Sequence, residues 1–187
     1  MATCREVITD AARKVGEVSE GRPAPTSYTA DNLLAILQAW YEQSVNTGMF
    51  GRLNDVLATV DYTAKEFDRI KASDGVTVTI PDTFSDCGRA RPPLDLALVV
   101  IAGASPEYHL YDSNVGDWVR LDGLTLDSLA PLSLRGRDGL ASVLAAMVLE
   151  DYGQEPGPII MARAGRFITT ISQRDASQRR EVDYEYM

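Results

Sequence analysis

The stretch Asp138-Gly-Leu-Ala-Ser-Val-Leu-Ala-Ala-Met-Val-Leu-Glu-Asp-Tyr-Gly153 decides how the rest of this chain is expected to fold. Its larger apolar residues recur with the spacing of one helical face, which predicts a helix with a buried side; they are Leu140, Val143, Leu144, Met147 and Val148. Gly153 can adopt the left-handed conformation that ends a helix. A second helical run, residues 158–172, follows after a short turn, and helices joined so tightly pack side by side. We expect the remaining chain to pack on this pair or to project from it.

The beginning of the chain predicts two more helices. Thr3 and Glu6 have the spacing of a capping box at the start of the first helix. A proline-containing loop follows it, and Thr29 or Asp31 is expected to cap the second helix, which ends near Asn46. Both helices carry apolar residues at helical spacing, so each should bury one face.

The middle of the chain changes from helical spacing to alternation with a period of two, which is typical of strands. Asp74-Gly75 is expected to form a hairpin turn between residues 67–71 and 76–80. A near-continuous apolar run at 94–102 predicts a buried strand. Two more strands are expected on either side of a turn at 112–116, and they cover residues 107–111 and 118–121.

The last stretch, residues 173–187, is too polar to form a core by itself. Val182, Tyr184 and Tyr186 alternate with acidic residues, so an extended strand would place the three apolar side chains on one face. Such a strand can pair with a partner's sheet edge or insert its aromatic rings into grooves. The candidate interface residues are therefore Arg179, Arg180, Val182, Tyr184, Tyr186 and Met187.

These patterns together predict an α+β fold. It consists of a helical bundle built from the N-terminal and C-terminal helices, with a small antiparallel β module inserted in the middle and an extended C-terminal tail. We expect an N-terminal helical part at residues 1–48 and a β-rich insertion at 49–125. A C-terminal helical part of the same domain should follow at 126–172, and the tail at 173–187.

Composition limits the chemistry that this chain is expected to perform. Its net charge of −9 disfavours wrapping around nucleic acid through phosphate contacts. Cys4, Cys87 and His109 are its only cysteine and histidine residues, fewer than the four ligands of a structural zinc site, so no metal or cofactor is expected. No apolar run reaches the ~20 residues that span a bilayer, and the N-terminus is not expected to be an export signal.

No catalytic motif stands out in the sequence. Phosphate-binding loops, zinc-protease motifs and serine nucleophile elbows are absent from it. Asp112 and Asp117 are expected to serve the turn between two strands. His109, which has no nucleophile motif nearby, is expected to be an ordinary strand residue.

Several stretches resemble the head-to-tail adaptor proteins of tailed bacteriophages. Ala39-Trp-Tyr41 at the end of the second helix, Leu129-Ala-Pro-Leu-Ser133 and Asp151-Tyr-Gly153 are similar to the opening and closing helical parts of these proteins. The family includes the packaged-DNA stabilisation proteins, or tail accessory factors, of short-tailed phages and the adaptors of gene transfer agents. The middle stretch, with Tyr111-Asp and Gly116-Asp-Trp118, resembles β-containing versions in marine phages.

The resemblance implies a structural virion protein at the head–tail junction, assembled in the host cytoplasm, with no catalytic residue and no membrane. Such adaptors are homo-oligomers that form a twelvefold ring below the portal and continue the DNA channel. They bind the portal protein through the C-terminal tail and also bind the next neck or tail protein, which is a stopper, nozzle or tail tube. Double-stranded DNA passes without tight binding, and acidic residues from 82–86 or 112–117 could repel it in the channel.

Two other classes of function stay open from the sequence. The first is a cell-wall hydrolase carried in a phage tail, which would use acidic residues such as Glu107 and Asp112. The second is a single-copy binding module whose β part holds a small ligand. A ring on the portal would favour the adaptor, whereas a catalytically active monomer would favour the hydrolase.

Overall fold

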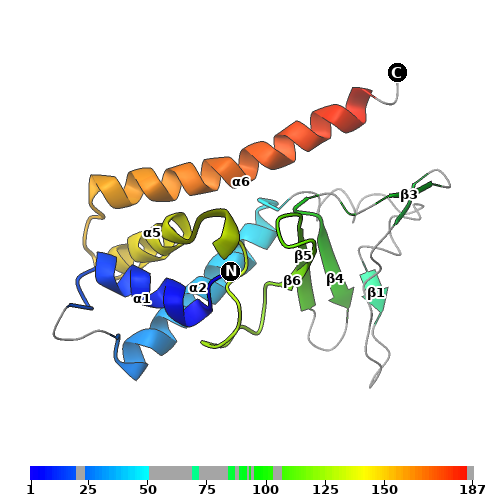
Figure 1. Cartoon of the computed structure of the whole chain (residues 1–187). Coiled ribbons are helices and arrows are strands. Elements are labelled where there is room, and N and C mark those ends of the chain that lie inside the picture. The colour runs from blue at the N-terminus through cyan, green and yellow to red at the C-terminus, as the bar shows by residue number, and fades with distance from the viewer. Residues whose placement is uncertain are drawn as a thin grey trace. The chain divides into compact units, whose positions relative to one another are not determined.

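The computed structural model of the chain describes residues 1–19, 24–50, 69–71, 84–86, 89–91, 93, 95–102 and 107–184. Within them lie helices that belong mainly to the two ends of the chain and strands that belong to its middle (Figure 1). The chain divides into two compact units: unit 1 comprises 1–41 and 123–170, and unit 2 comprises 42–122 and 171–187. The α+β class predicted from the sequence is confirmed.

The first helix, α1 (Cys4–Lys14), begins with the predicted capping box. The Thr3 side chain accepts a hydrogen bond from the Glu6 amide at 3.3 Å, and the Thr3 amide donates to the Glu6 carboxylate at 2.8 Å. The helix buries one complete face against α5 (Ser133–Asp151); this face consists of Cys4, Val7, Ile8, Ala11 and Ala12.

The second helix, α2 (Ser27–Asn46), begins earlier than predicted. The Thr29 amide donates to the Thr26 hydroxyl at 3.2 Å, so Thr26 is the capping residue and the prediction of Thr29 or Asp31 was wrong. Nothing in residues 27–30 breaks a helix, and Thr26 is the first residue after Pro25 whose hydroxyl can reach an orphan amide. The predicted end at Asn46 is confirmed, and Gly48 follows with a φ of +71°.

Helix α5 is buried on nearly all sides and contains the predicted apolar face. Leu140, Val143, Leu144 and Val148 are buried, as are the alanines between them, whereas Met147 is half-buried. The helix starts several residues before Asp138, with a kink at Gly136, where φ is 170° and ψ is 71°. It ends as predicted, because Gly153 takes a φ of +67°.

A close approach between α5 and α6 (Pro158–Tyr184) explains both glycines of α5. A Cβ atom at Gly139 would lie 2.6 Å from Phe167 Cβ, and one at Gly136 would lie 3.0 Å from the Phe167 ring. Phe167 is buried, and its ring centroid lies 6.2 Å from that of Trp40 in α2. The two glycines therefore let the α6 backbone come close enough for Phe167 to join the core of unit 1.

Helix α6 is longer than the sequence analysis predicted. It continues from residue 172 to Tyr184, so this part of the tail is helical rather than extended. The reason is local: Gln173–Tyr184 contains no glycine or proline, and arginine, glutamine, glutamate and alanine are good helix formers. Low hydrophobicity alone does not prevent a helix from continuing once it has been nucleated upstream.

The N-terminal residues are tied by backbone hydrogen bonds to the segment before α5. The Cys4 amide donates to the Ser128 carbonyl at 2.8 Å, and the Ala130 amide donates to the Ala2 carbonyl at 2.8 Å. The Ala2 amide also donates to the Ser133 hydroxyl at 2.9 Å. These bonds join the two distant parts of the sequence that build unit 1.

Unit 2 contains the sheet. Strands β4 (Leu98–Ala102), β5 (Glu107–Asp112) and β6 (Asp117–Arg120) form an antiparallel meander, so the hairpin predicted around residues 112–116 is confirmed. Strand β1 (Arg69–Lys71) adds to β4 in parallel, which makes the sheet mixed rather than purely antiparallel. Leu96, with a φ of +63°, interrupts the extended backbone and delays the start of β4 relative to the predicted 94.

A separate two-stranded antiparallel ladder, which the sequence analysis did not predict, is formed by β2 (Phe84–Asp86) and β3 (Arg89–Arg91). The second arm of the hairpin predicted at Asp74-Gly75 lies outside the described residues. Among the helices that are described, none combines the length and the apolar composition needed to cross a bilayer.

Candidate functional site

The two carboxylates of the hydrolase alternative, Glu107 and Asp112, lie at opposite ends of β5. Neighbouring side chains of a strand point to opposite faces, so residues five positions apart lie on different faces and about 16 Å apart along the strand. In a glycosidase, the two catalytic carboxyl groups lie on either side of the glycosidic bond that is cleaved, roughly 5–10 Å apart. Glu107 and Asp112 therefore do not form such a pair.

Asp112 and Asp117 have the turn roles predicted for them. The Asp112 side chain is buried, and its Oδ1 accepts from the Asn114 amide at 3.0 Å and from Asn114 Nδ2 at 3.1 Å. Asp117 Oδ1 accepts from the Trp118 amide at 2.7 Å. Because Asp112 is buried, it is not available to repel DNA, which leaves Asp117 as the exposed acid of this turn. In the other candidate loop, Asp82 lies outside the described residues.

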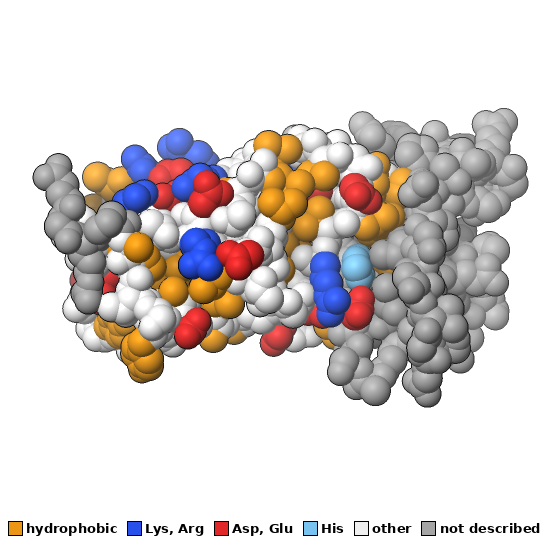
Figure 2. Space-filling model, turned by 60° about the horizontal axis from the view of Figure 1, so that its bottom comes forward, with side chains coloured by type: hydrophobic (Ala, Val, Ile, Leu, Met, Phe, Trp, Pro, Cys, Tyr) orange, Lys and Arg blue, Asp and Glu red, His pale blue; other side chains and the backbone are white. Residues whose placement is uncertain are grey.

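A chain of ion pairs links β5 to β6, and the sequence analysis missed it. His109 Nε2 lies 3.2 Å from Glu107 Oε2, and Arg120 contacts Glu107 at 3.3 Å and Asp122 at 2.9 Å. Figure 2 shows the single histidine, in pale blue, at the surface beside a basic and an acidic side chain. The register of the hairpin, which the sequence analysis did not predict, places Arg120 opposite His109. His109 is a strand residue, as predicted, and its contacts brace the hairpin.

The described cysteine is not suited to chemistry. Cys4 is fully buried, and burial raises the pKa of its thiol to about 11, so that it stays protonated and is a weak nucleophile at neutral pH. Cys87 lies outside the described residues. Among the residues that are described, no group of histidine, cysteine, aspartate and glutamate side chains could hold a metal ion.

The candidate interface residues at the C-terminus are placed only in part. Arg179, Arg180, Val182 and Tyr184 belong to the helical backbone of α6, whereas Tyr186 lies beyond the described residues, as does Met187. The period-two arrangement proposed for these side chains requires extended backbone, so it does not apply to Val182 and Tyr184. Their role in an interface remains a prediction.

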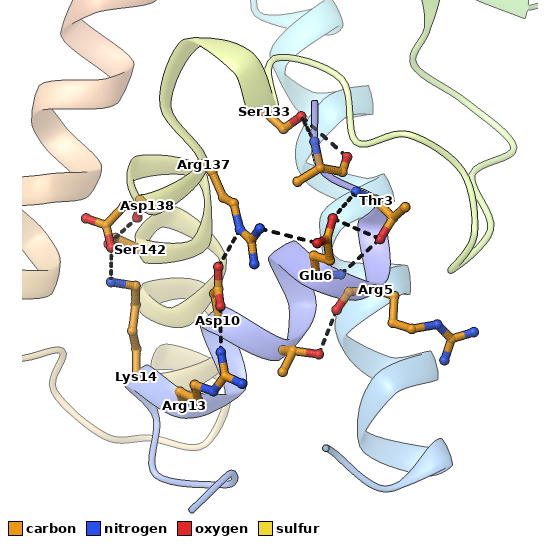
Figure 3. A network of polar contacts seen from close by, with 12 residues as sticks. Thr3, Arg5, Glu6, Asp10, Arg13, Lys14, Ser133, Arg137, Asp138 and Ser142 are labelled. Carbon is orange, nitrogen blue, oxygen red and sulfur yellow. Dashed lines mark hydrogen bonds and ion pairs between the residues drawn. The ribbon is translucent and has the colours of Figure 1, made fainter. Parts of the chain in front are cut away.

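A polar network on unit 1 connects α1 to α5 (Figure 3). Arg137 of α5 donates to Asp10 at 2.6 Å and approaches Glu6 at 3.5 Å, both on α1. Asp10 also pairs with Arg13 at 3.0 Å. The pKa of Glu6 is lowered, first by the hydrogen bond from the Thr3 amide and then by the charge of Arg137. The capping box and the interhelical ion pair thus share one carboxylate.

Asp138 joins three helices. It lies 2.6 Å from Lys14 Nζ of α1 and 3.0 Å from Arg163 Nη1 of α6. The hydrogen bond from Lys14 lowers the pKa of Asp138 most, and the charges of Lys14 and Arg163 lower it further. Its side chain is 61% exposed, which screens these interactions. Asp138 therefore orients α6 on unit 1, while Phe167 provides the buried contact.

Besides Tyr28 on α2, which is 81% exposed, the described residues of unit 1 expose two groups of large apolar side chains. The first, called the N-end patch, lies where the N-terminal residues meet the segment before α5 and comprises Met1, Leu129 and Leu134, which are 48–50% exposed. The second, called the corner patch, lies at the turn between α5 and α6 and comprises Tyr152, which is 50% exposed, and Ile159, which is 68% exposed. Met161 is 48% exposed, but it lies two positions after Ile159 on the helix and faces another side of α6. Residues 159–161 are three consecutive apolar residues. They cannot all face the core side of one helix, so the sequence already indicated that an apolar side chain would be exposed here.

Three acidic residues lie close to the corner patch in the sequence. Glu150, Asp151 and Glu155 are exposed, and none of them forms an ion pair within the described part of the chain. Most of the net negative charge of the protein lies in residues 42–122, which contain thirteen acidic and seven basic side chains and so carry −6 of the total −9.

Comparison of the sequence with models of known protein families gave no match, and a comparison with characterised proteins gave none either.

Proposed function

We propose that this chain is a structural virion protein, a head-to-tail adaptor that forms a ring below the portal and continues the DNA channel. The observation that carries the proposal is the organisation of unit 1. Its helices α1, α2 and α5 and the start of α6 come from the two ends of the chain, and the β-rich segment is inserted between them. This is the organisation that the resemblance to adaptor proteins implies.

The charge distribution supports a passage for DNA. The inserted segment 42–122 carries a net charge of −6, whereas the whole chain carries −9. Repeated around a ring, this charge repels phosphates, so that a duplex slides instead of adhering. The proposal therefore gives the β-rich segment the surface nearest to the DNA.

The partners follow from the same proposal. Twelve copies form the ring, the C-terminal segment 173–187 attaches it to the portal protein, and the opposite side binds a stopper, nozzle or tail tube. The protein is assembled in the host cytoplasm and ends in the virion at the head–tail junction. Arg179 and Arg180, together with the apolar residues that follow them, are the proposed attachment residues.

The hydrolase alternative receives less support, because its named carboxylates, Glu107 and Asp112, lie on opposite faces of one strand. The binding-module alternative differs from the adaptor in its assembly, since it predicts a single copy.

Native mass measurement and particle imaging, with and without purified portal rings, test the proposed function. A ring that caps the portal coaxially is the expected result. A protein that stays monomeric with the portal and cleaves cell-wall material would refute the adaptor assignment.

A further inference from the structure

The two exposed apolar patches of unit 1 lie at opposite ends of α5. Leu134 lies before the kink at Gly136, and Tyr152 directly follows the last residue of α5, so the regular helix after the kink, about 22 Å long, lies between them. Figure 1 shows the N-terminus beside the start of α5, whereas α6 begins at its other end. Exposed apolar side chains gathered in this way mark interaction surfaces.

The C-terminal end of α5 carries charge that its dipole does not favour. Its last turn contains no basic residue, and Glu150 and Asp151 lie at this end. Carboxylates add to the negative C-terminal end of a helix, so this arrangement is unfavourable within one molecule. At the other end the backbone is non-helical at Gly136, and Asp138 lies in the first regular turn that follows it.

The acidic side chains at the end of α5 are complementary to arginine side chains at the N-end patch of a second molecule. The acids around the corner patch have no ion pairs in the described part of the chain. The N-end patch is bordered by Arg5, which is 58% exposed and pairs with the 85% exposed Asp127. It is also bordered by Arg137, which is 40% exposed and pairs with Asp10 and Glu6. A guanidinium group has five N–H donors, so each arginine can keep its present partners and bind a further carboxylate.

We propose that the corner patch of one copy binds the N-end patch of a second copy. Leu129 and Leu134 would then cover Tyr152 and Ile159, while Arg5 faces the Glu150, Asp151 and Glu155 carboxylates. The contact joins two different surfaces of the chain, so it leaves one free surface on each partner and propagates into a closed ring or a filament. This inference rests on the proposed function and specifies which surfaces make the ring.

Complementary defective variants of the full chain test this contact. Ile159→Asp places a charge in the corner patch, and Leu129→Asp places one in the N-end patch. Both positions are at least half exposed, so neither change disturbs the core. Each variant alone should sediment as a monomer at concentrations at which the unmodified protein assembles. An equimolar mixture should form one-to-one dimers and nothing larger, since each variant keeps one intact surface.

Thr169→Asp is the matched control. Thr169 is exposed on α6, away from both patches, so this variant should assemble like the unmodified protein. Circular dichroism of each variant checks that the helical content is unchanged. Assembly of either defective variant on its own, loss of assembly in the control, or a mixture that stays monomeric would overturn the proposed contact.

The outcome also separates this inference from the proposed function. If the unmodified protein forms rings on the portal and both defective variants do so equally well, the adaptor role stands and the proposed contact is wrong. If the unmodified protein never assembles, with or without the portal, both proposals fail.

Discussion

Gly139→Ala offers a direct test of the packing between α5 and α6. In an open helix this change is stabilising by about 1 kcal/mol, because alanine has the higher helix propensity. In this protein the added Cβ would lie 2.6 Å from Phe167 Cβ and 3.0 Å from Phe167 Cγ. Carbon atoms pack at about 3.5–4.0 Å, so the two helices must separate by roughly 1 Å.

The magnitude follows from these two opposing effects. Phe167 Cβ is attached to the α6 backbone, and a rotation of the side chain cannot move it away. Overpacking of this kind costs about 1–3 kcal/mol, which equals or exceeds the gain in helix propensity of about 1 kcal/mol. We therefore expect Gly139→Ala to lower the free energy of unfolding by up to about 2 kcal/mol.

Gly165→Ala is the control, because Gly165 lies inside α6 and a Cβ there would meet nothing within 4 Å. It gains the same propensity without a clash, so the difference between the two variants isolates the steric cost. The measurement is urea unfolding of the full chain followed by far-ultraviolet circular dichroism. Equal midpoints for the two variants would refute the close packing of Phe167 on Gly139.

The other predictions concern the core, pH, DNA and the tail. Leu144→Ala should destabilise the protein by about 2–5 kcal/mol, because Leu144 is fully buried, and an unchanged melting temperature would contradict this. The folded-state pKa of Asp138 is depressed, so its contribution is present above about pH 4 and is lost as the pH falls through the folded value; Asp138→Asn should therefore show a weaker acid-induced loss of stability in melts recorded from pH 6 to 3. The purified protein should retain little duplex DNA at low salt, and tight, salt-sensitive binding in a mobility-shift assay would reject the anionic channel. Deleting residues 181–187 should leave melting nearly unchanged but weaken attachment to portal rings, and full affinity of the truncated protein would exclude this segment as the anchor.

Features that depend on neighbouring residues could be predicted from the sequence. The capping box of α1 requires only Thr3 and Glu6, and the end of α5 requires only a glycine that can adopt a positive φ. The turn between β5 and β6 depends on Asp112 and its hydrogen bonds to Asn114, two residues away. In each case the residues that satisfy the backbone lie within a few positions, so spacing alone is informative.

Predictions from local sequence were wrong where several residues could serve as the cap, or where the prediction depended only on the average polarity of a segment. Thr26, Thr29 and Asp31 are all good capping residues, and the choice of Thr26 depends on where the helix can first form. The polar segment after residue 172 was expected to be extended, but a helix nucleated upstream continues through it to Tyr184.

The sequence by itself determined the helices at the two ends, the antiparallel meander in the middle and the acidic balance, because these depend on periodicity, caps and composition. Only the tertiary structure decided that Gly139 makes room for Phe167, that β1 joins β4 in parallel and that Asp138 ties α1 to α6. The proposed contact surfaces could not be predicted from the sequence either. Nothing in the sequence distinguishes Leu129 and Ile159 from buried apolar residues, and only the structure shows that they are exposed, near opposite ends of α5. The physical reason is the same in each case. These contacts join residues that are distant in the chain, and their energies depend on how close the side chains come in the folded structure, which the spacing of residues along the sequence does not show.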